Sequence, residues 1–160
     1  MGVARWLVSM LACGVPAALL AAPISPLDLP ADMRATIEKT VPGMMITGAE
    51  RKERDGRIYH DVEGRRPDGA EVELDILQTP GGWEVVEIQR DIGWADVPAL
   101  ARDTAAPALA GITPARVIES RQMDGRIIYE LFKPGAPETP AFEVMVDGGK
   151  AQLLTEAWPH

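Results

Sequence analysis

The chain is poor in the residues on which most protein catalysis depends. It contains two histidines, His60 and His160, and only Ser25 and Ser120 follow the N-terminal apolar run as serines. Neither serine stands in the G-x-S-x-G context of a nucleophile elbow. Adjacent residues of a strand point to opposite faces, so His60 and Asp61 are poorly placed to share a metal ion. We therefore expect no enzyme, no metal site and no cofactor.

Cysteine is also nearly absent, and its position matters. Residues 1–22 combine Arg5 with a long apolar run that has no charged stop-transfer flank, which is typical of a secretory signal peptide. Cleavage after Ala21 or Ala22 removes the single cysteine, Cys13, and with it any disulfide. Lipid attachment to Cys13 is the alternative processing. We expect a periplasmic or secreted protein with no stable membrane insertion after cleavage.

Basic residues are too few for an electrostatic role on nucleic acid. Without Arg5, 15 basic residues stand against 24 acidic residues, which leaves a net charge of −9. Phosphate backbones and anionic lipids are bound by concentrated Lys and Arg, so neither is an expected partner. The dense charge run from Glu50 to Arg57 mixes both signs, which is typical of a solvated strand edge. A docking surface for a protein is the alternative interpretation.

Three blocks of the sequence recur at a nearly constant spacing. "DLPADMRATIEKT" from Asp28 matches "DVPALARDTAAPA" from Asp96, an offset of 68 residues. "DGRI" begins at Asp55 and again at Asp124, an offset of 69, and "EVELDI" matches "EVMVDG" at an offset of 72. We therefore predict a tandem duplication, with residues 28–93 as the first copy and 94–160 as the second.

Each copy is predicted to begin with a helix. Asp28 and Asp96 are the expected N-caps, and Pro30 and Pro98 suit the first helical turn, where no N–H is needed. Pro107 is expected to interrupt the second helix after residue 106. Small residues in that helix indicate a close approach to a sheet.

Four strands of an antiparallel meander are predicted after each helix. Asp-Gly dipeptides at residues 55–56, 68–69 and 124–125 favour hairpin turns. In the strand that begins at Glu71, apolar and acidic residues alternate, as in a sheet with one packed and one solvated face. The second copy carries a longer loop, Lys133 to Pro140. The predicted fold class is α+β, with two tandem repeats that each pack an N-terminal helix on a four-stranded antiparallel β-sheet.

Together, the signal peptide, capped helices, "DGRI" hairpins and "E-V-x-[LV]-D" strands resemble the PepSY and PepSY-like superfamily. The match extends through "DGRIYHDVE" and "AEVELDILQTPGGWEVV" in one copy and "DGRIIYELF" and "FEVMVDGGKAQLL" in the other. The resemblance implies a β-lactamase-inhibitory-protein-like arrangement, in which two units present a concave sheet to a protein target. It also implies an inhibitory or binding module without catalytic residues.

The expected function is non-catalytic binding of a protein, such as inhibition or modulation of an envelope or secreted enzyme. The candidate protein-binding residues come from the charge run, the connector, the second-copy strand end and the long loop: Arg51, Arg54, Trp94, Phe132, Lys133 and Glu138. A carrier of a small ligand or metal ion is the alternative, and it would use acidic strands and the methionines Met44, Met45, Met123 and Met145. A structural protein with no single partner is a third hypothesis. The sequence leaves the oligomeric state and the target open.

Overall fold

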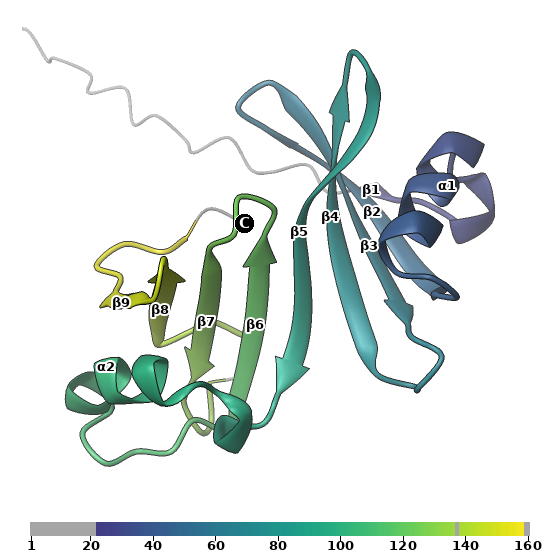
Figure 1. Cartoon of the computed structure of the whole chain (residues 1–160). Helices are drawn as coiled ribbons and strands as arrows, with labels where there is room; N and C mark the ends of the chain where they lie inside the picture. Colours follow the sequence, from purple (N-terminus) through teal and green to yellow (C-terminus); the bar gives the residue numbers. More distant parts are fainter. Residues whose placement is uncertain (1–21, 137, 159–160) are drawn as a thin grey trace, which may run out of the picture.

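The computed structural model describes residues 22–136 and 138–158. The predicted signal peptide, including Cys13, lies outside the described residues apart from Ala22. In the described ranges, nine strands form one antiparallel sheet in chain order, accompanied by two α-helices (Figure 1). Neither helix is long and apolar enough to cross a membrane.

The bounds of the elements follow the chain order of the sheet. The helices are α1 (Ala31–Thr40) and α2 (Ala99–Leu109), and each follows a single 3-10 turn, η1 (Pro26–Asp28) or η2 (Trp94–Asp96). The strands are β1 (Ala22–Pro23), β2 (Met45–Arg54), β3 (Arg57–Arg65), β4 (Glu71–Thr79), β5 (Gly82–Ile92), β6 (Arg116–Gln122), β7 (Ile127–Phe132), β8 (Phe142–Asp147) and β9 (Lys150–Leu153).

Both helices begin later than the sequence predicts. Asp28 and Asp96 are the last residues of the 3-10 turns, and they are not helix N-caps. Pro30 and Pro98 occupy the N-cap positions instead, without a side-chain cap. Proline fixes φ and has no N–H to satisfy, so it orients the chain for the helix that follows.

The second helix also ends later than predicted. α2 continues through Pro107 to Leu109, so the expected interruption after residue 106 is wrong. Proline removes one backbone hydrogen bond of the helix, but Ala101, Ala105 and Leu109 bury one face of α2 against the sheet. Packing of that apolar face outweighs the local preference of a single residue.

The prediction of two tandem repeats with separate four-stranded sheets is wrong, because β5 joins all strands into one sheet. The first part of β5 pairs with β4, from Gly82 opposite Thr79 to Gln89 opposite Glu73. Its last part pairs with β6, from Glu87 to Ile92. Two separate sheets would each expose an open edge, and pairing of β5 with β6 removes both edges at once. The α+β class itself is confirmed.

Both helices cover the same face of this sheet. α1 packs on a hydrophobic cluster that includes Leu74 of β4, and α2 packs on a second cluster that includes Leu131 of β7. In β5, Ile88 contacts the first cluster and Ile92 the second. Residues four apart in a strand lie on one face, so both clusters are on the same side. We call the opposite side the helix-free face.

The predicted alternation of the third strand is confirmed on its apolar side. Val72, Leu74 and Ile76 of β4 are buried in the α1 cluster. The corresponding residues of β8, Phe142, Val144 and Val146, pack in the α2 cluster. The Asp-Gly dipeptides at 55–56, 68–69 and 124–125 all lie between paired strands, as expected.

Gly64 provides a test of the packing between β3 and β2. A Cβ atom there would lie 2.7 Å from the Met45 carbonyl oxygen and would overlap the Met44 side chain. We expect Gly64→Ala to lower the free energy of unfolding by about 1–3 kcal/mol, because backbone cannot move aside without strain. Urea denaturation measures the change. Gly48→Ala is the control, since its closest neighbour is the flexible end of Glu63 at 3.1 Å. Equal losses in both variants would contradict this packing.

Candidate functional site

Acidic side chains from three neighbouring strands gather on the helix-free face. Asp75 of β4 lies directly between Asp61 of β3 and Glu87 of β5 in the register of the sheet. One step along, Glu63 of β3 stands opposite Glu73 of β4. Like charges directly opposite in a sheet destabilise it. We call these five carboxyls the acidic cluster.

Two basic side chains of β2 approach the acidic cluster. Lys52 Nζ forms an ion pair with Asp61 Oδ2. Arg54 Nη2 lies 3.8 Å from Asp75 Oδ2, at the outer limit of an ion pair. Arg54 also lies over the ring of Tyr59, with 4.5 Å from the guanidinium carbon to the ring centroid. Lys52 and Arg54 therefore approach two of the five carboxyls, Asp61 and Asp75.

Ser120 of β6 connects the cluster to the second half of the sheet. Its hydroxyl is fully buried and donates to Glu87 Oε1, and Gln89 Nε2 donates to the same oxygen at 2.9 Å. The other candidate serine, Ser25, accepts a hydrogen bond from Leu27 N in η1. His60 is buried on the opposite face, with its ring 5.1 Å from that of Trp83. His60 therefore has a packing role.

Burial and repulsion change the titration of the two central carboxyls. Removal from water, reinforced by the charges of Asp61, Glu63 and Glu87, raises the pKa of Glu73 to about 7. The same causes, burial first and then Asp61 and Glu87, raise the pKa of Asp75 to about 6. Lys52 and Arg54 oppose this rise without cancelling it.

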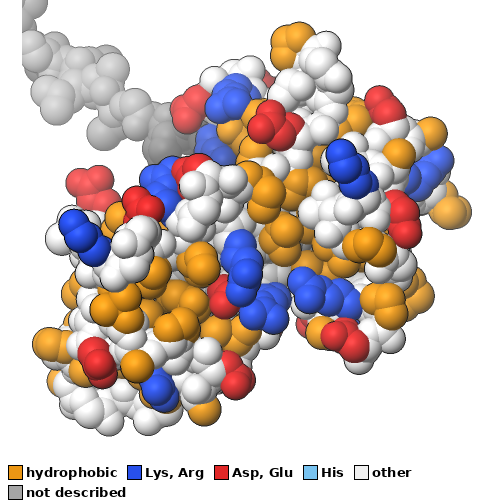
Figure 2. All heavy atoms as spheres, in the orientation of Figure 1, with side chains coloured by type: hydrophobic (Ala, Val, Ile, Leu, Met, Phe, Trp, Pro, Cys, Tyr) orange, Lys and Arg blue, Asp and Glu red, His pale blue; other side chains and the backbone are white. Residues whose placement is uncertain are grey.

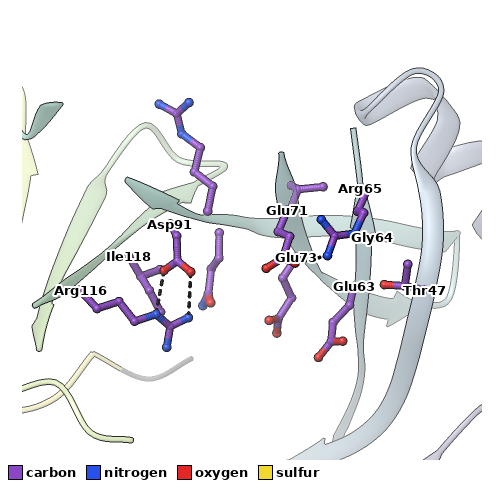
Figure 3. Close-up of a pocket in the computed structure, with 12 residues that line it drawn as sticks. Thr47, Glu63, Gly64, Arg65, Glu71, Glu73, Asp91, Arg116 and Ile118 are labelled. Atoms are coloured by element: carbon purple, nitrogen blue, oxygen red, sulfur yellow. Dashed lines mark hydrogen bonds and ion pairs between the residues drawn. The ribbon is translucent and has the colours of Figure 1, made fainter. Parts of the chain in front are cut away.

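A first hollow opens where β5 leaves β4 and passes to β6. Its volume is about 320 Å³, and residues of five strands line it. Figure 3 shows Glu63, Arg65, Glu71 and Glu73 on one side of it, and Arg116 bonded to Asp91 on the other. The surface view also shows a notch between the two ends of the molecule, with basic side chains on both sides (Figure 2).

A second hollow of about 360 Å³ lies at the other end of the junction. Asp75 and Glu87 of the acidic cluster reach it, together with three arginines, Arg54, Arg57 and Arg126. Arg126 pairs with Asp124 in the turn between β6 and β7 and lies 4.5 Å above the Trp158 ring. Three arginines line each hollow, together with four carboxylates in the first hollow and three in the second.

The candidate residues of the charge run and connector occupy three different environments. Arg51 of β2 pairs with Glu53 at 3.6 Å, opposite the buried His60. Arg54 belongs to the surroundings of the acidic cluster, as described above. Trp94 of η2 is partly buried and packs against the α2 cluster, so it is not a free aromatic anchor.

The other candidate residues lie at the end of β7 and in the loop that follows. Phe132 is 3 % exposed, so its ring is not available on the surface as an anchor for a partner. The Arg116 guanidinium lies 5.2 Å from its ring centroid and helps to cover it. Lys133 Nζ lies 4.7 Å from the ring centroid of Phe142, and Glu138 is exposed.

The methionines of the carrier hypothesis do not form one site. Met44 is buried in the α1 cluster, whereas Met45 is 60 % exposed and Met123 is 51 % exposed. Met145 of β8 is half-buried. Among residues 22–136 and 138–158, no group of three or more His, Cys, Asp or Glu side chains is arranged to hold a metal ion.

Comparison with known proteins gives no family assignment. No family model matches the chain, and no curated protein matches its sequence. The resemblance to PepSY domains therefore stays a prediction, and the geometry of the helix-free face has to carry any proposal about function.

The raised pKa values predict how stability depends on pH. Glu73 and Asp75 have ordinary pKa values of 4.5 and 3.8, so the folded state binds extra protons up to about pH 7. Their contribution to stability is therefore present at low pH and is lost as pH rises through 6 and 7. We expect the double variant Glu73→Gln/Asp75→Asn to be more stable than the wild type at pH 8, by roughly 1–3 kcal/mol.

Urea denaturation between pH 5 and pH 8 measures this effect as a difference between wild type and variant. The control variant is Asp28→Asn/Asp103→Asn, which removes the same charge from two exposed positions outside the acidic cluster. It should keep the wild-type pH dependence. An unchanged pH dependence in the Glu73→Gln/Asp75→Asn variant would show that these carboxyls titrate normally.

Proposed function

We propose that this chain is an exported, non-catalytic module that binds a protein partner through the helix-free face of its sheet. One observation carries the proposal: on this face the half-buried Glu73 and the buried Asp75 stand next to other carboxyls, and the ion-pair contact of Asp75 is as long as 3.8 Å. Such an arrangement lowers stability, and proteins keep unfavourable groups mainly where function uses them.

The size and shape of the face fit a protein better than a small ligand. The two hollows lie at opposite ends of the β4 to β6 junction, and both are shared by several strands. Polar and charged side chains form most of their lining, whereas pockets for small organic ligands are mostly apolar. A protein partner would contact a broad, charged surface. Complementary charges on the partner would then give the contact its specificity.

Affinity capture tests the proposal with a steric block. Thr47 is exposed at the rim of the first hollow, and Thr113 is exposed in the loop between α2 and β6. We expect the tagged full chain and its Thr113→Trp variant to retain the same protein from an envelope extract, and Thr47→Trp to reduce its recovery at least tenfold. Melting temperatures verify that both variants are folded.

A third bait locates the site if the steric block has no effect. This variant replaces residues 133–140 by Asp-Gly, the turn found at the matching place in the first half of the sequence. If only this variant loses the partner, the long loop is the binding site and the helix-free face is not. Recovery of the same proteins by every bait would exclude both surfaces.

A further inference from the structure

We propose that the second hollow binds the C-terminal residue of a partner polypeptide, with Arg57 holding its carboxylate and Asp75 accepting a hydrogen bond from its amide N–H. We call this arrangement the terminus site. The inference rests on the proposed function and names the part of the partner that reaches one point of the helix-free face.

The repeated "DGR" motif brings an arginine from each half of the sequence to this hollow. Arg57 follows the Asp-Gly turn after β2, and Arg126 follows the Asp-Gly turn after β6. Arg126 is neutralised within its own turn, because its Nε donates to Asp124 Oδ2 at 2.8 Å. Arg57 forms no ion pair with any residue that the structure describes, and its guanidinium carbon lies 5.8 Å from the Tyr59 ring centroid. The same motif therefore supplies one paired and one unpaired guanidinium.

The turn between β2 and β3 also brings two guanidinium groups to one aromatic ring. Asp55 and Gly56 have φ values of 53° and 71°, as a two-residue type I′ turn requires. This turn sets Arg54 directly opposite Arg57 in the register of the two strands, and both lie over Tyr59. Like charges directly opposite destabilise a sheet. A carboxylate that accepts from these groups would relieve their repulsion.

Asp75 is a buried acceptor at the same hollow. It is 9 % exposed and forms part of the lining. Its Oδ1 has no hydrogen-bond partner in the described part of the chain, and its Oδ2 lies 3.8 Å from Arg54 Nη2. A buried polar atom without a partner is unfavourable, so a donor from a ligand would stabilise the complex. Rotation about the last bond of the side chain can present either oxygen to that donor, because this torsion is broad.

A ligand with both a donor and a negative charge fits this hollow better than an isolated ion. An isolated cation would satisfy Asp75 but would add to the unpaired charge of Arg57. An isolated anion would pair with Arg57 but would leave Asp75 without a donor. The last residue of a polypeptide carries an amide N–H and a carboxylate on one Cα atom, so it can serve both side chains at once.

The hollow has room for one such residue. Its volume is about 360 Å³, within the range of ligand pockets. Arg54 lies 3.8 Å from Asp75 and over the same ring as Arg57, so one guanidinium group separates the two ends of the terminus site. Leu77 and the exposed Met123 form an apolar part of the lining. We therefore expect the last side chain of the partner to be apolar.

Peptide binding to the full chain tests the inference. The probe is acetyl-glycyl-leucine with a free carboxylate, and its C-terminal amide is the uncharged isostere. Isothermal titration at pH 7.5, above the pKa of about 6 of Asp75, measures affinity, and ¹³C chemical shifts of the guanidinium carbons show which arginine is contacted. We expect the acid to bind at least tenfold more tightly than the amide and to shift the Arg57 resonance. Equal binding of acid and amide overturns the inference.

Two charge-matched variants locate the carboxylate. Arg57→Gln should weaken binding of the acid at least tenfold. Lys39→Gln removes the same charge from an exposed position of α1 and should change the affinity less than twofold. Equal weakening by both variants contradicts the inference, because the attraction would then be general. Melting temperatures verify that both variants are folded.

A double-mutant cycle tests the hydrogen bond to Asp75. Acetyl-glycyl-N-methyl-leucine keeps the carboxylate and lacks the N–H. N-methylation should weaken binding to the wild type at least fivefold, whereas Asp75→Ala should bind both peptides within twofold of each other, since the acceptor is gone. The same loss in both proteins would show that Asp75 accepts no hydrogen bond from the peptide.

Free leucine distinguishes a chain terminus from a free amino acid. It has the same carboxylate, but an ammonium group replaces the amide. We expect it to bind at least tenfold more weakly than acetyl-glycyl-leucine. Binding that is equal or tighter overturns the inference, because the hollow would then serve a free amino acid.

The outcome separates this inference from the proposed function. If the captured partner is lost by Thr47→Trp but retained by Arg57→Gln, the helix-free face binds protein and the terminus site is wrong. If the acid peptide binds as expected but no captured protein depends on the helix-free face, the terminus site is real and the proposed function is wrong.

Discussion

The pairing of β5 with both of its neighbours is the constraint on which the rest of the structure depends. β5 overlaps β4 and β6 together only over Glu87, Ile88 and Gln89, because its earlier residues pair with β4 and its later residues with β6. This stagger joins two hydrophobic clusters into one sheet through Ile88 and Ile92. It also opens a hollow at each end of the overlap, so the same strand that closes the fold creates its candidate site.

The charge of the helix-free face follows from register more than from composition. A net negative charge spread over a surface is screened by salt and has little effect on stability. Here the antiparallel register places Asp61, Asp75 and Glu87 in one row across three strands, and burial removes the screening water. The raised pKa of Asp75 is the expected response, because burial and the charges of Asp61 and Glu87 outweigh the opposing effect of Arg54 and Lys52.

The sequence predicts the local elements well, because local rules decide them. Alternation identifies Val72, Leu74 and Ile76 as one packed face, and Asp-Gly dipeptides mark the turns. Pairing between strands that are distant in sequence has no comparable signal: alternation describes a strand but not its neighbour. The junction of β5 with β6, the buried position of Phe132 and the opposition of Asp61 to Asp75 were therefore not predicted. Pro107 was misjudged for the opposite reason, because tertiary packing overrode a local rule.

These differences between expectation and structure converge on the same region. Local prediction treats Glu73 and Asp75 as the solvated side of an alternating strand, which is the most ordinary role for acidic residues in a sheet. The structure instead makes Asp75 a buried carboxyl with an unpaired oxygen, and it makes Glu73 a half-buried one opposite Glu63. Strand register and burial therefore decide whether an acidic residue of an alternating strand stays in water, and alternation alone carries no information on either.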